Sequence, residues 1–66
     1  CVNQDAQPNG DHEVHDLAST RGCLPAPENR LNLGTHASCV GAVALAKLLF
    51  PQSNGCYWCA RACNTG

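Results

Sequence analysis

The longest apolar run of the chain covers residues 39–50 and is rich in Ala and Leu. Both residue types favour helix, whereas the Pro51 that follows cannot continue a helical hydrogen-bond ladder. Thr35 or Ser38 can cap the start of such a helix by accepting a hydrogen bond from an unpaired backbone N–H. The pattern therefore predicts a helix over about residues 37–50.

The predicted helix is apolar on nearly every side. At a step of about 100° per residue, the side opposite its main apolar face still carries Val40, Ala44 and Leu48. A helix of this kind is buried or lies in a membrane, but the run is well short of the roughly 20 residues that span a bilayer. We therefore expect a core helix, in preference to an amphipathic surface binder, and no membrane span. The main apolar face consists of Cys39, Ala42, Val43, Ala46, Leu49 and Phe50.

A second ordered segment is expected after a turn over residues 51–55, which contain Pro and an Asn-Gly pair. From Cys56 to Cys63 the sequence reads CYWCARAC, with cysteines at positions i, i+3 and i+7. These positions share one face of a helix, and Gly66 follows the segment. A strand would place the first two cysteines on opposite faces and would suit the aromatic pair between them. We favour a helix over about residues 55–63 and keep the strand as the alternative.

The cysteines indicate how the two predicted helices are joined. Two helices linked by a short turn run antiparallel, which brings Cys39 at the start of the first near Cys63 at the end of the second. Cys39–Cys63 is therefore the best single bridge. The other two bridges can form in two ways, which the residues leave open. In both, Cys1 and Cys23 take Cys56 and Cys59 as partners.

The N-terminal half carries weaker signals. Residues 1–11 are polar and turn-rich, and residues 12–18 suit either a short helix or a short strand. Prolines make residues 24–27 extended, and residues 30–33 alternate polar and apolar side chains as a strand does. The predicted fold is therefore one small disulfide-rich, mainly α domain over residues 1–66. It contains an antiparallel helix pair and an irregular N-terminal half that can include a short strand.

Composition points to a secreted protein in which all six cysteines form three disulfides. A chain of 66 residues is too small to depend on its core alone, and an even number of cysteines suits a disulfide scaffold. The chain begins at Cys1 and contains no Met, which suggests a processed extracellular product. Four basic and five acidic residues give a net charge of −1 without a block of either sign, which argues against a nucleic-acid partner. We expect a monomer without a cofactor.

A zinc site is the sharpest rival to disulfides. The chain contains one H-x2-H pair and one C-x2-C pair, which together could supply the four ligands of a tetrahedral ion. The usual order places the cysteine pair first, however, and the other four cysteines would be left unexplained. We therefore predict no metal ligand and expect the histidines, His36 among them, to be polar surface residues. The two pairs are His12 with His15 and Cys56 with Cys59.

The C-Y-W-C segment also resembles the spacing of thiol–disulfide oxidoreductases. Such a site needs a lowered thiolate pKa at a helix N-terminus, usually after a strand in a βαβ unit. No unit of that size fits this chain, and neighbouring cysteines would compete for exchange. A structural role for this segment is the better interpretation.

A small secreted nuclease or hydrolase is the enzymatic alternative. Two histidines lie beside two carboxylates, an arrangement that can support acid–base cleavage of a phosphodiester. Arg21 and Arg30 could then stabilise the phosphate. Nothing in the spacing fixes this geometry, so we predict no catalytic residue and no enzyme. The candidate acid–base residues are His12, Glu13, His15 and Asp16.

Tyr57 and Trp58 are two of only three aromatic residues. Beside three cysteines, they are expected to cover bridges. If Trp58 is exposed, it becomes the first candidate for an interface, because tryptophan is enriched among the residues that dominate binding energy. Arg61 would flank it. These three residues are the predicted binding residues.

The six cysteines, the apolar run over residues 39–50 and the segment GCYWC at residues 55–59 resemble small secreted cysteine-rich proteins of the fungal effector and toxin type. The resemblance covers the whole chain in style and matches no specific family motif. It implies a non-enzymatic protein, released by a microbe, that binds a protein or glycan of a host or competitor. A diffusible signalling peptide or a venom-type toxin is the alternative, because it requires the same scaffold.

Overall fold

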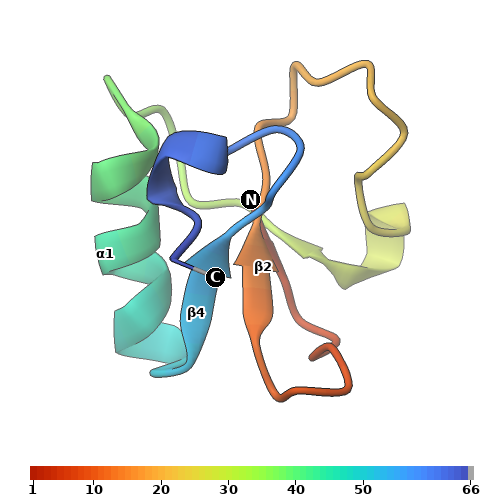
Figure 1. Cartoon of the computed structure of the whole chain (residues 1–66), viewed down its shortest axis with the longest axis vertical. Coiled ribbons are helices and arrows are strands. Elements are labelled where there is room, and N and C mark those ends of the chain that lie inside the picture. Colours follow the sequence, from red (N-terminus) through yellow and green to blue (C-terminus); the bar gives the residue numbers. More distant parts are fainter. Residues whose placement is uncertain (66) are drawn as a thin grey trace.

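Short strands and irregular segments make up the N-terminal half, and one long helix dominates the C-terminal half (Figure 1). The computed structural model describes residues 1–65, so Gly66, expected to follow the second helix and to end the predicted domain, lies outside the described residues. The helical elements are η1 (Pro27–Asn29), α1 (Cys39–Leu49) and η2 (Arg61–Cys63), where η denotes a 3₁₀ helix. The strands are β1 (Val2–Asn3), β2 (His12–Val14), β3 (Arg30–Leu31) and β4 (Ser53–Gly55).

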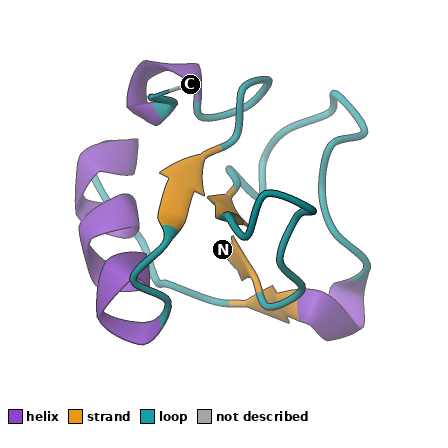
Figure 2. Cartoon of the chain, turned by 60° about the horizontal axis from the view of Figure 1, so that its bottom comes forward, coloured by secondary structure: helices purple, strands orange, loops and turns teal. Residues whose placement is uncertain are grey.

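Within residues 1–65 the four strands form one mixed sheet in the order β3-β1-β2-β4 (Figure 2). β1 pairs antiparallel with both β2 and β3, whereas β2 and β4 run parallel. Val14 lies opposite Gly55 in the parallel pair, and the backbone N–H of Cys56 donates to the carbonyl of Val14 at 2.8 Å. Parallel strands have their carboxyl ends at the same edge of a sheet. The segments that follow β2 and β4 therefore start side by side.

A small hydrophobic core lies between the sheet and α1. Ser53 fastens the end of α1 to β4, because its hydroxyl donates to the carbonyl of Phe50 at 2.6 Å. Residues 1–65 thereby form a compact globule of 24 × 22 × 22 Å. The buried core residues are Val2, Val14, Leu33 and Ala46, with Leu31, Ala42, Val43 and Phe50 packed against them.

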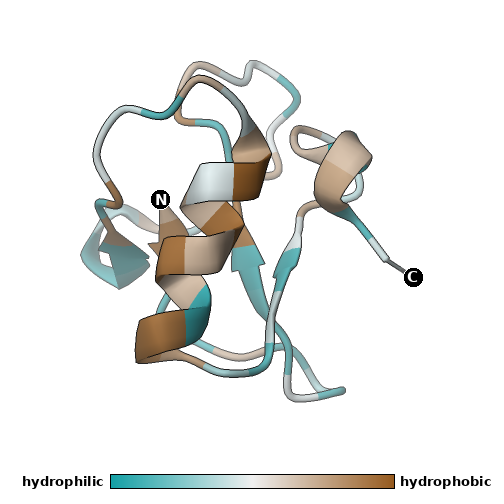
Figure 3. Cartoon of the chain, turned by 90° about the vertical axis from the view of Figure 1, so that its left-hand side faces the viewer, coloured by the Kyte–Doolittle hydropathy of each residue, from teal (hydrophilic) through white to brown (hydrophobic). Residues whose placement is uncertain are grey.

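The helix predicted over residues 37–50 is confirmed as α1, and Ser38 occupies the N-cap position without a side-chain hydrogen bond to the helix. The expectation that this helix is buried is wrong. Ala46 is its only fully buried residue within the described chain, whereas Leu48 is 81% exposed. A sheet of two- and three-residue strands can cover only one side of the helix, so the opposite apolar side faces solvent (Figure 3). No described helix is long and apolar enough to cross a bilayer.

The mainly α fold with a second helix over residues 55–63 is wrong. Residues 53–55 form β4 and residues 57–59 a turn, and up to residue 65 the only helical residues that follow are those of η2. Gly55 explains this path: a Cβ at that position would lie 2.6 Å from the carbonyl oxygen of Ala60 and 2.8 Å from the Cβ of Cys63. The chain therefore folds back tightly over β4, and β4 pairs with β2 rather than forming the first turn of a helix.

The N-terminal half contains more strand than expected. β1 lies within residues 1–11, which were expected to be irregular. The segment over residues 12–18 provides β2, so the strand alternative is correct there, and the strand candidate over residues 30–33 is present in shorter form as β3. These strands are too short to carry a clear alternating pattern, and their pairing with one another decides their conformation.

The expected three disulfides are also corrected: within the described residues, one pair of cysteines is at bonding distance. Cys39 at the start of α1 is bridged to Cys63 in η2, with an S–S distance of 2.03 Å. This is the pair favoured in the sequence analysis, although the second helix that suggested it is absent. A bridge that separates its cysteines by 24 positions stabilises the folded chain by about 3 kcal/mol in the chain-entropy model. The unbridged cysteines are Cys1, Cys23, Cys56 and Cys59.

Candidate functional site

Three thiols and one imidazole converge at the carboxyl ends of β2 and β4. Their ligand atoms all lie within 4.8 Å of one another. We refer to this group as the thiol–imidazole cluster. Its members are His15, Cys23, Cys56 and Cys59.

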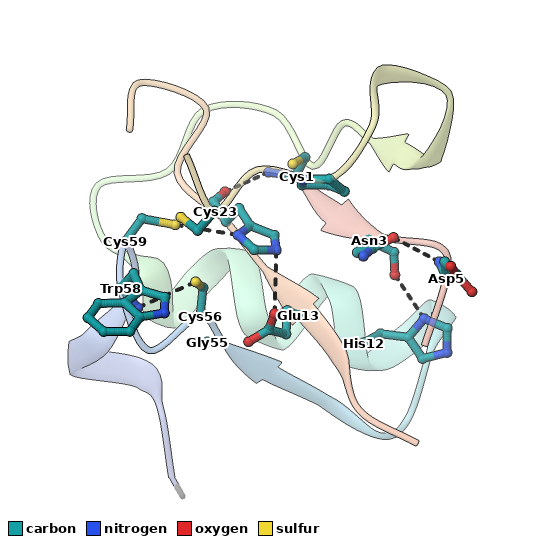
Figure 4. Close-up of polar contacts among 12 residues, drawn as sticks. Cys1, Asn3, Asp5, His12, Glu13, Cys23, Gly55, Cys56, Trp58 and Cys59 are labelled. Atoms are coloured by element: carbon teal, nitrogen blue, oxygen red, sulfur yellow. Dashed lines mark hydrogen bonds and ion pairs between the residues drawn. The ribbon is translucent and has the colours of Figure 1, made fainter. Parts of the chain in front are cut away.

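The sheet and one turn position three of the four members. His15 directly follows β2 and Cys56 directly follows β4, so the parallel pairing places them next to each other. The backbone N–H of Ala60 donates to the carbonyl of Cys56 at 3.0 Å, which closes the turn that carries Cys59. Cys23 comes from the long loop between β2 and η1. In Figure 4 the side chains of Cys23 and Cys59 point toward each other.

Backbone N–H groups are directed at two of the sulfur atoms. The backbone N–H of Asp16 donates to Cys59 Sγ at 3.4 Å. The backbone N–H of Trp58 donates to Cys56 Sγ, also at 3.4 Å (Figure 4). The third sulfur, of Cys23, lies 3.8 Å from the hydroxyl oxygen of Ser19. Hydrogen bonds to sulfur favour the ionised form of a thiol. The surroundings are therefore suited to thiolates.

The imidazole of His15 is buried and has a neighbour on each side. Its Nδ1 lies 3.5 Å from Cys59 Sγ, and its Nε2 lies 3.8 Å from a carboxylate oxygen of Glu13. Burial lowers the pKa of His15 and raises that of Glu13, since both charged forms lose solvation. The negative charge of Asp11 adds to the upward shift of the Glu13 pKa. Burial thus favours a neutral imidazole, the form that binds metal ions.

Burial opposes the ionisation of Cys59 in the absence of a cation. Burial raises the pKa of Cys59 to about 12, although the N–H of Asp16 opposes this shift. For Cys23, burial raises the pKa, but hydrogen bonds with Cys59, Ser19 and Cys56 together outweigh it, and the net shift is downward. Like charges so close disfavour one another, whereas a bound cation reverses this preference and deprotonates a coordinating thiol. The cluster could therefore hold a metal ion.

Cys1 is the one unbridged cysteine that stands outside the cluster. It is buried, and its backbone pairs with that of His15: the Cys1 nitrogen donates to the His15 carbonyl at 2.9 Å, and the His15 N–H donates back at 2.7 Å. This pairing continues the ladder between β1 and β2. An open cavity of about 770 Å³ has Cys1, His15 and Cys59 among its lining residues. Solutes therefore have a route to one side of the cluster.

The two histidines of the predicted H-x2-H pair are separated. His12 stacks on the ring of Phe50, with 4.1 Å between the ring centroids, and its Nδ1 lies 2.9 Å from the carbonyl oxygen of Asn3. His15 is 4% exposed, so the expectation of a surface histidine is wrong for this residue. Its exposure is low because it directly follows β2, which lies between β1 and β4 in the sheet. The structure therefore does not assemble His12 and His15 into one acid–base or metal site.

Cys23 is the cluster member that the zinc hypothesis missed. It is separated from His15 by a loop and from Cys56 by most of the remaining chain, so no local spacing connects it to either. The C-x2-C pair was the visible signal, and Cys23 joins it only through the fold.

The three predicted binding residues form a separate group, which we call the aromatic surface: Tyr57, Trp58 and Arg61. Trp58 is 60% exposed and Tyr57 46%, so both rings present a large part of their surface to solvent. The two rings meet edge to face at 4.9 Å, and the guanidinium carbon of Arg61 lies 4.8 Å from the centroid of the Tyr57 ring. These contacts order the aromatic surface while leaving the tryptophan accessible.

No family model, curated protein or solved structure matches this chain. The thiol–imidazole cluster offers metal ligands, and the aromatic surface offers an anchor for a partner.

Proposed function

We propose that this protein is a secreted, non-enzymatic binding protein of the effector type, which acts by attaching to a protein of a host or competitor. The observation that carries this proposal is the exposure of Trp58, which is 60% accessible although the chain has few aromatic residues to place. Exposure was the condition under which Trp58 became the first candidate for an interface, and Trp58 is exposed. The aromatic surface is the proposed contact region.

The composition of the aromatic surface suits an anchor. Tryptophan, tyrosine and arginine are the residue types most enriched among those that dominate binding energy. Trp58 and Tyr57 lie in the turn closed by the hydrogen bond between Ala60 and Cys56, and Arg61 stacks on the tyrosine. An anchor that is ordered before binding loses less conformational entropy when it binds.

The exposed face of α1 extends the apolar region beside η2. A shallow groove runs between α1 and η2, and the Cys39–Cys63 bridge ties these two elements together. Monomeric soluble proteins rarely leave large contiguous apolar patches uncovered, so such a face supports an interaction role. Lys47 contributes the only charge among the groove residues. The large exposed apolar residues of α1 are Val40, Leu45, Leu48 and Leu49.

The charge of the chain favours a protein partner over a polyanion or a membrane surface. A net charge of −1 with no basic block offers little attraction to phosphate groups. The exposed Trp58 ring could also stack on a sugar, and the enzyme treatments described below distinguish a glycan partner from a protein. A diffusible signal or a venom-type toxin would use the same surface, and the type of cell that responds would distinguish these roles.

Binding of labelled protein to a panel of intact plant, animal and microbial cells tests this proposal. On the cells that bind, Trp58→Ala should raise the dissociation constant by at least about 30-fold, because truncating a central aromatic anchor costs about 2 kcal/mol or more. Leu17→Ala is the matched control, since Leu17 is an exposed apolar residue from a different part of the fold.

The outcomes separate the possible partners. Loss of binding after mild protease treatment of the cells supports a protein partner, whereas loss after glycosidase treatment contradicts it in favour of a glycan. Leakage of dye from protein-free vesicles contradicts it in favour of a membrane. Equal affinities for the wild type and Trp58→Ala would remove the aromatic surface from the proposal. Trp58 is the only tryptophan, so its fluorescence emission reports directly on its burial in a complex.

A further inference from the structure

The thiol–imidazole cluster has the ligands and the spacing of a tetrahedral metal site. In a zinc site with Zn–S bonds near 2.3 Å and Zn–N bonds near 2.0 Å, neighbouring ligand atoms stand about 3.5–3.8 Å apart. All the ligand atoms of the cluster lie within 4.8 Å of one another, and the distance from His15 Nδ1 to Cys59 Sγ is already 3.5 Å. Small side-chain movements therefore bring the four atoms to bonding distance of one ion.

We propose that His15, Cys23, Cys56 and Cys59 bind one zinc ion in a closed, structural site. Three thiolates and one imidazole form a ligand set that is typical of structural zinc and fills all four positions. Binding converts three thiols to thiolates and releases up to three protons, while the neutral imidazole donates its lone pair without losing a proton. No redox step is involved.

The surroundings of the ligands support the proposal independently. A metal-binding histidine usually directs its second ring nitrogen at a carboxylate or carbonyl, which fixes the tautomer and the orientation of the ring. His15 has this arrangement: its Nδ1 faces Cys59 and its Nε2 faces Glu13. The backbone N–H groups directed at Cys56 and Cys59 complete the pattern, because they stabilise metal-bound thiolates.

A zinc ion at the cluster would also anchor the loop that carries Cys23. None of residues 16–30 is buried or packed against the hydrophobic core, so the core contributes little to fixing this stretch. Cys23 lies in its middle. A zinc ion would fasten Cys23 to the segments that follow β2 and β4, and it would therefore stabilise the loop.

A disulfide from Cys23 to Cys56 or to Cys59 is the competing chemistry. Such a bridge uses two sulfur atoms and leaves the third beside a buried imidazole. The third thiol could then form a disulfide only with Cys1, although Cys1 is not a member of the cluster. A metal ion uses all four converging groups, which is why the geometry favours it.

The zinc site does not depend on the proposed binding function. It shares one turn of the chain with the aromatic surface, however. Trp58 lies in the turn between the ligands Cys56 and Cys59, and its backbone N–H donates to Cys56 Sγ. Zinc would therefore hold the turn that presents Trp58. The emission of this tryptophan should change when the ion is removed, even if no partner is ever found.

Titration of Co²⁺ into metal-free protein that retains the Cys39–Cys63 bridge tests the proposal, with oxygen excluded. One equivalent should produce the visible bands of tetrahedral cobalt and the near-ultraviolet charge transfer of thiolate ligands, and zinc should remove both. Cys23→Ser and His15→Asn should each weaken zinc binding by more than about 100-fold, because they remove a ligand. Glu13→Gln should weaken it by about tenfold, because it removes only the support of the imidazole.

The controls use the same residue types outside the cluster. Cys1→Ser and His36→Asn should leave the cobalt spectrum and the zinc affinity unchanged. Zinc should also protect three thiols of the wild type from alkylation, a measurement that remains valid if a ligand variant fails to fold. Weak cobalt absorption typical of octahedral sites, or a peptide map that joins Cys23 to Cys56 or Cys59 in protein prepared without reductant, would overturn the proposal.

Discussion

Val14 lies opposite Gly55 in the parallel pairing of β2 and β4, and this register places His15 beside Cys56. The position of the whole cluster follows from it, because Cys59 lies one turn beyond Cys56 and Cys23 closes over the same edge. The register in turn depends on the absence of a side chain at Gly55, where the returning chain packs directly on the backbone.

Gly55→Ala should therefore destabilise the fold by about 2–3 kcal/mol, because an added methyl group would overlap backbone and side-chain atoms that cannot move far. Urea unfolding monitored by Trp58 fluorescence measures the change. Gly41→Ala is the matched control: the atom nearest to its new methyl group would be Nδ1 of the His36 side chain, at 3.0 Å, and alanine favours the helix. Equal stability of the two variants would show that the chain does not pack against Gly55 as described.

Substitutions on opposite sides of α1 should have different effects on stability. Ala46→Leu should cost about 1–3 kcal/mol, because Ala46 is fully buried against the sheet and a larger side chain overpacks the core. Leu48→Gln should change the free energy of unfolding by less than about 0.5 kcal/mol, because Leu48 is 81% exposed. Urea unfolding of both variants measures this contrast. A large loss of stability in Leu48→Gln would restore the buried helix that the apolar pattern suggested.

Acid should destabilise the metal-free protein through His15. Burial holds the pKa of this imidazole below its usual value of 6.5 in the folded chain, so the unfolded chain binds a proton first as the pH falls. The stability that His15 contributes is therefore present above pH 6.5 and is lost as the pH falls toward the folded pKa. Glu13 acts in the opposite direction, because its raised pKa favours the folded state below its usual value of 4.5 and disfavours it as the pH rises.

Unfolding free energies measured across this range in the presence of a chelator test the assignment. His15→Asn should remove the loss of stability below pH 6.5, and His36→Asn should retain it. If His15→Asn keeps the full pH dependence of the wild type, the loss arises elsewhere.

The features that the sequence predicted well are the local ones. The helix over residues 37–50 rests on an apolar run that is broken only by Lys47 and ends before Pro51, and such a signal needs no knowledge of the rest of the chain. The Cys39–Cys63 pair was favoured for a different reason, a second helix that is absent, and the bridge instead joins α1 to the short η2.

The remaining features depend on contacts between distant segments. Residues 53–55 form a strand because β2 offers them a partner, and their sequence alone, Ser-Asn-Gly, indicates only a turn. His15 belongs to the cluster and His12 does not, because the sheet register separates two histidines of similar local sequence. Cys23 is brought to the cluster by a loop with no pattern of its own. Only the fold shows that three of the six cysteines meet around one imidazole.

Native mass spectrometry, before and after acidification, tests the arrangement of the six cysteines most directly. From protein prepared without reductant, we predict a native species that carries one zinc ion. Acid should release the ion and leave a chain about 2 Da lighter than the fully reduced one, the mass of one disulfide. A metal-free chain about 6 Da lighter, with three disulfides, would contradict the cluster as a zinc site.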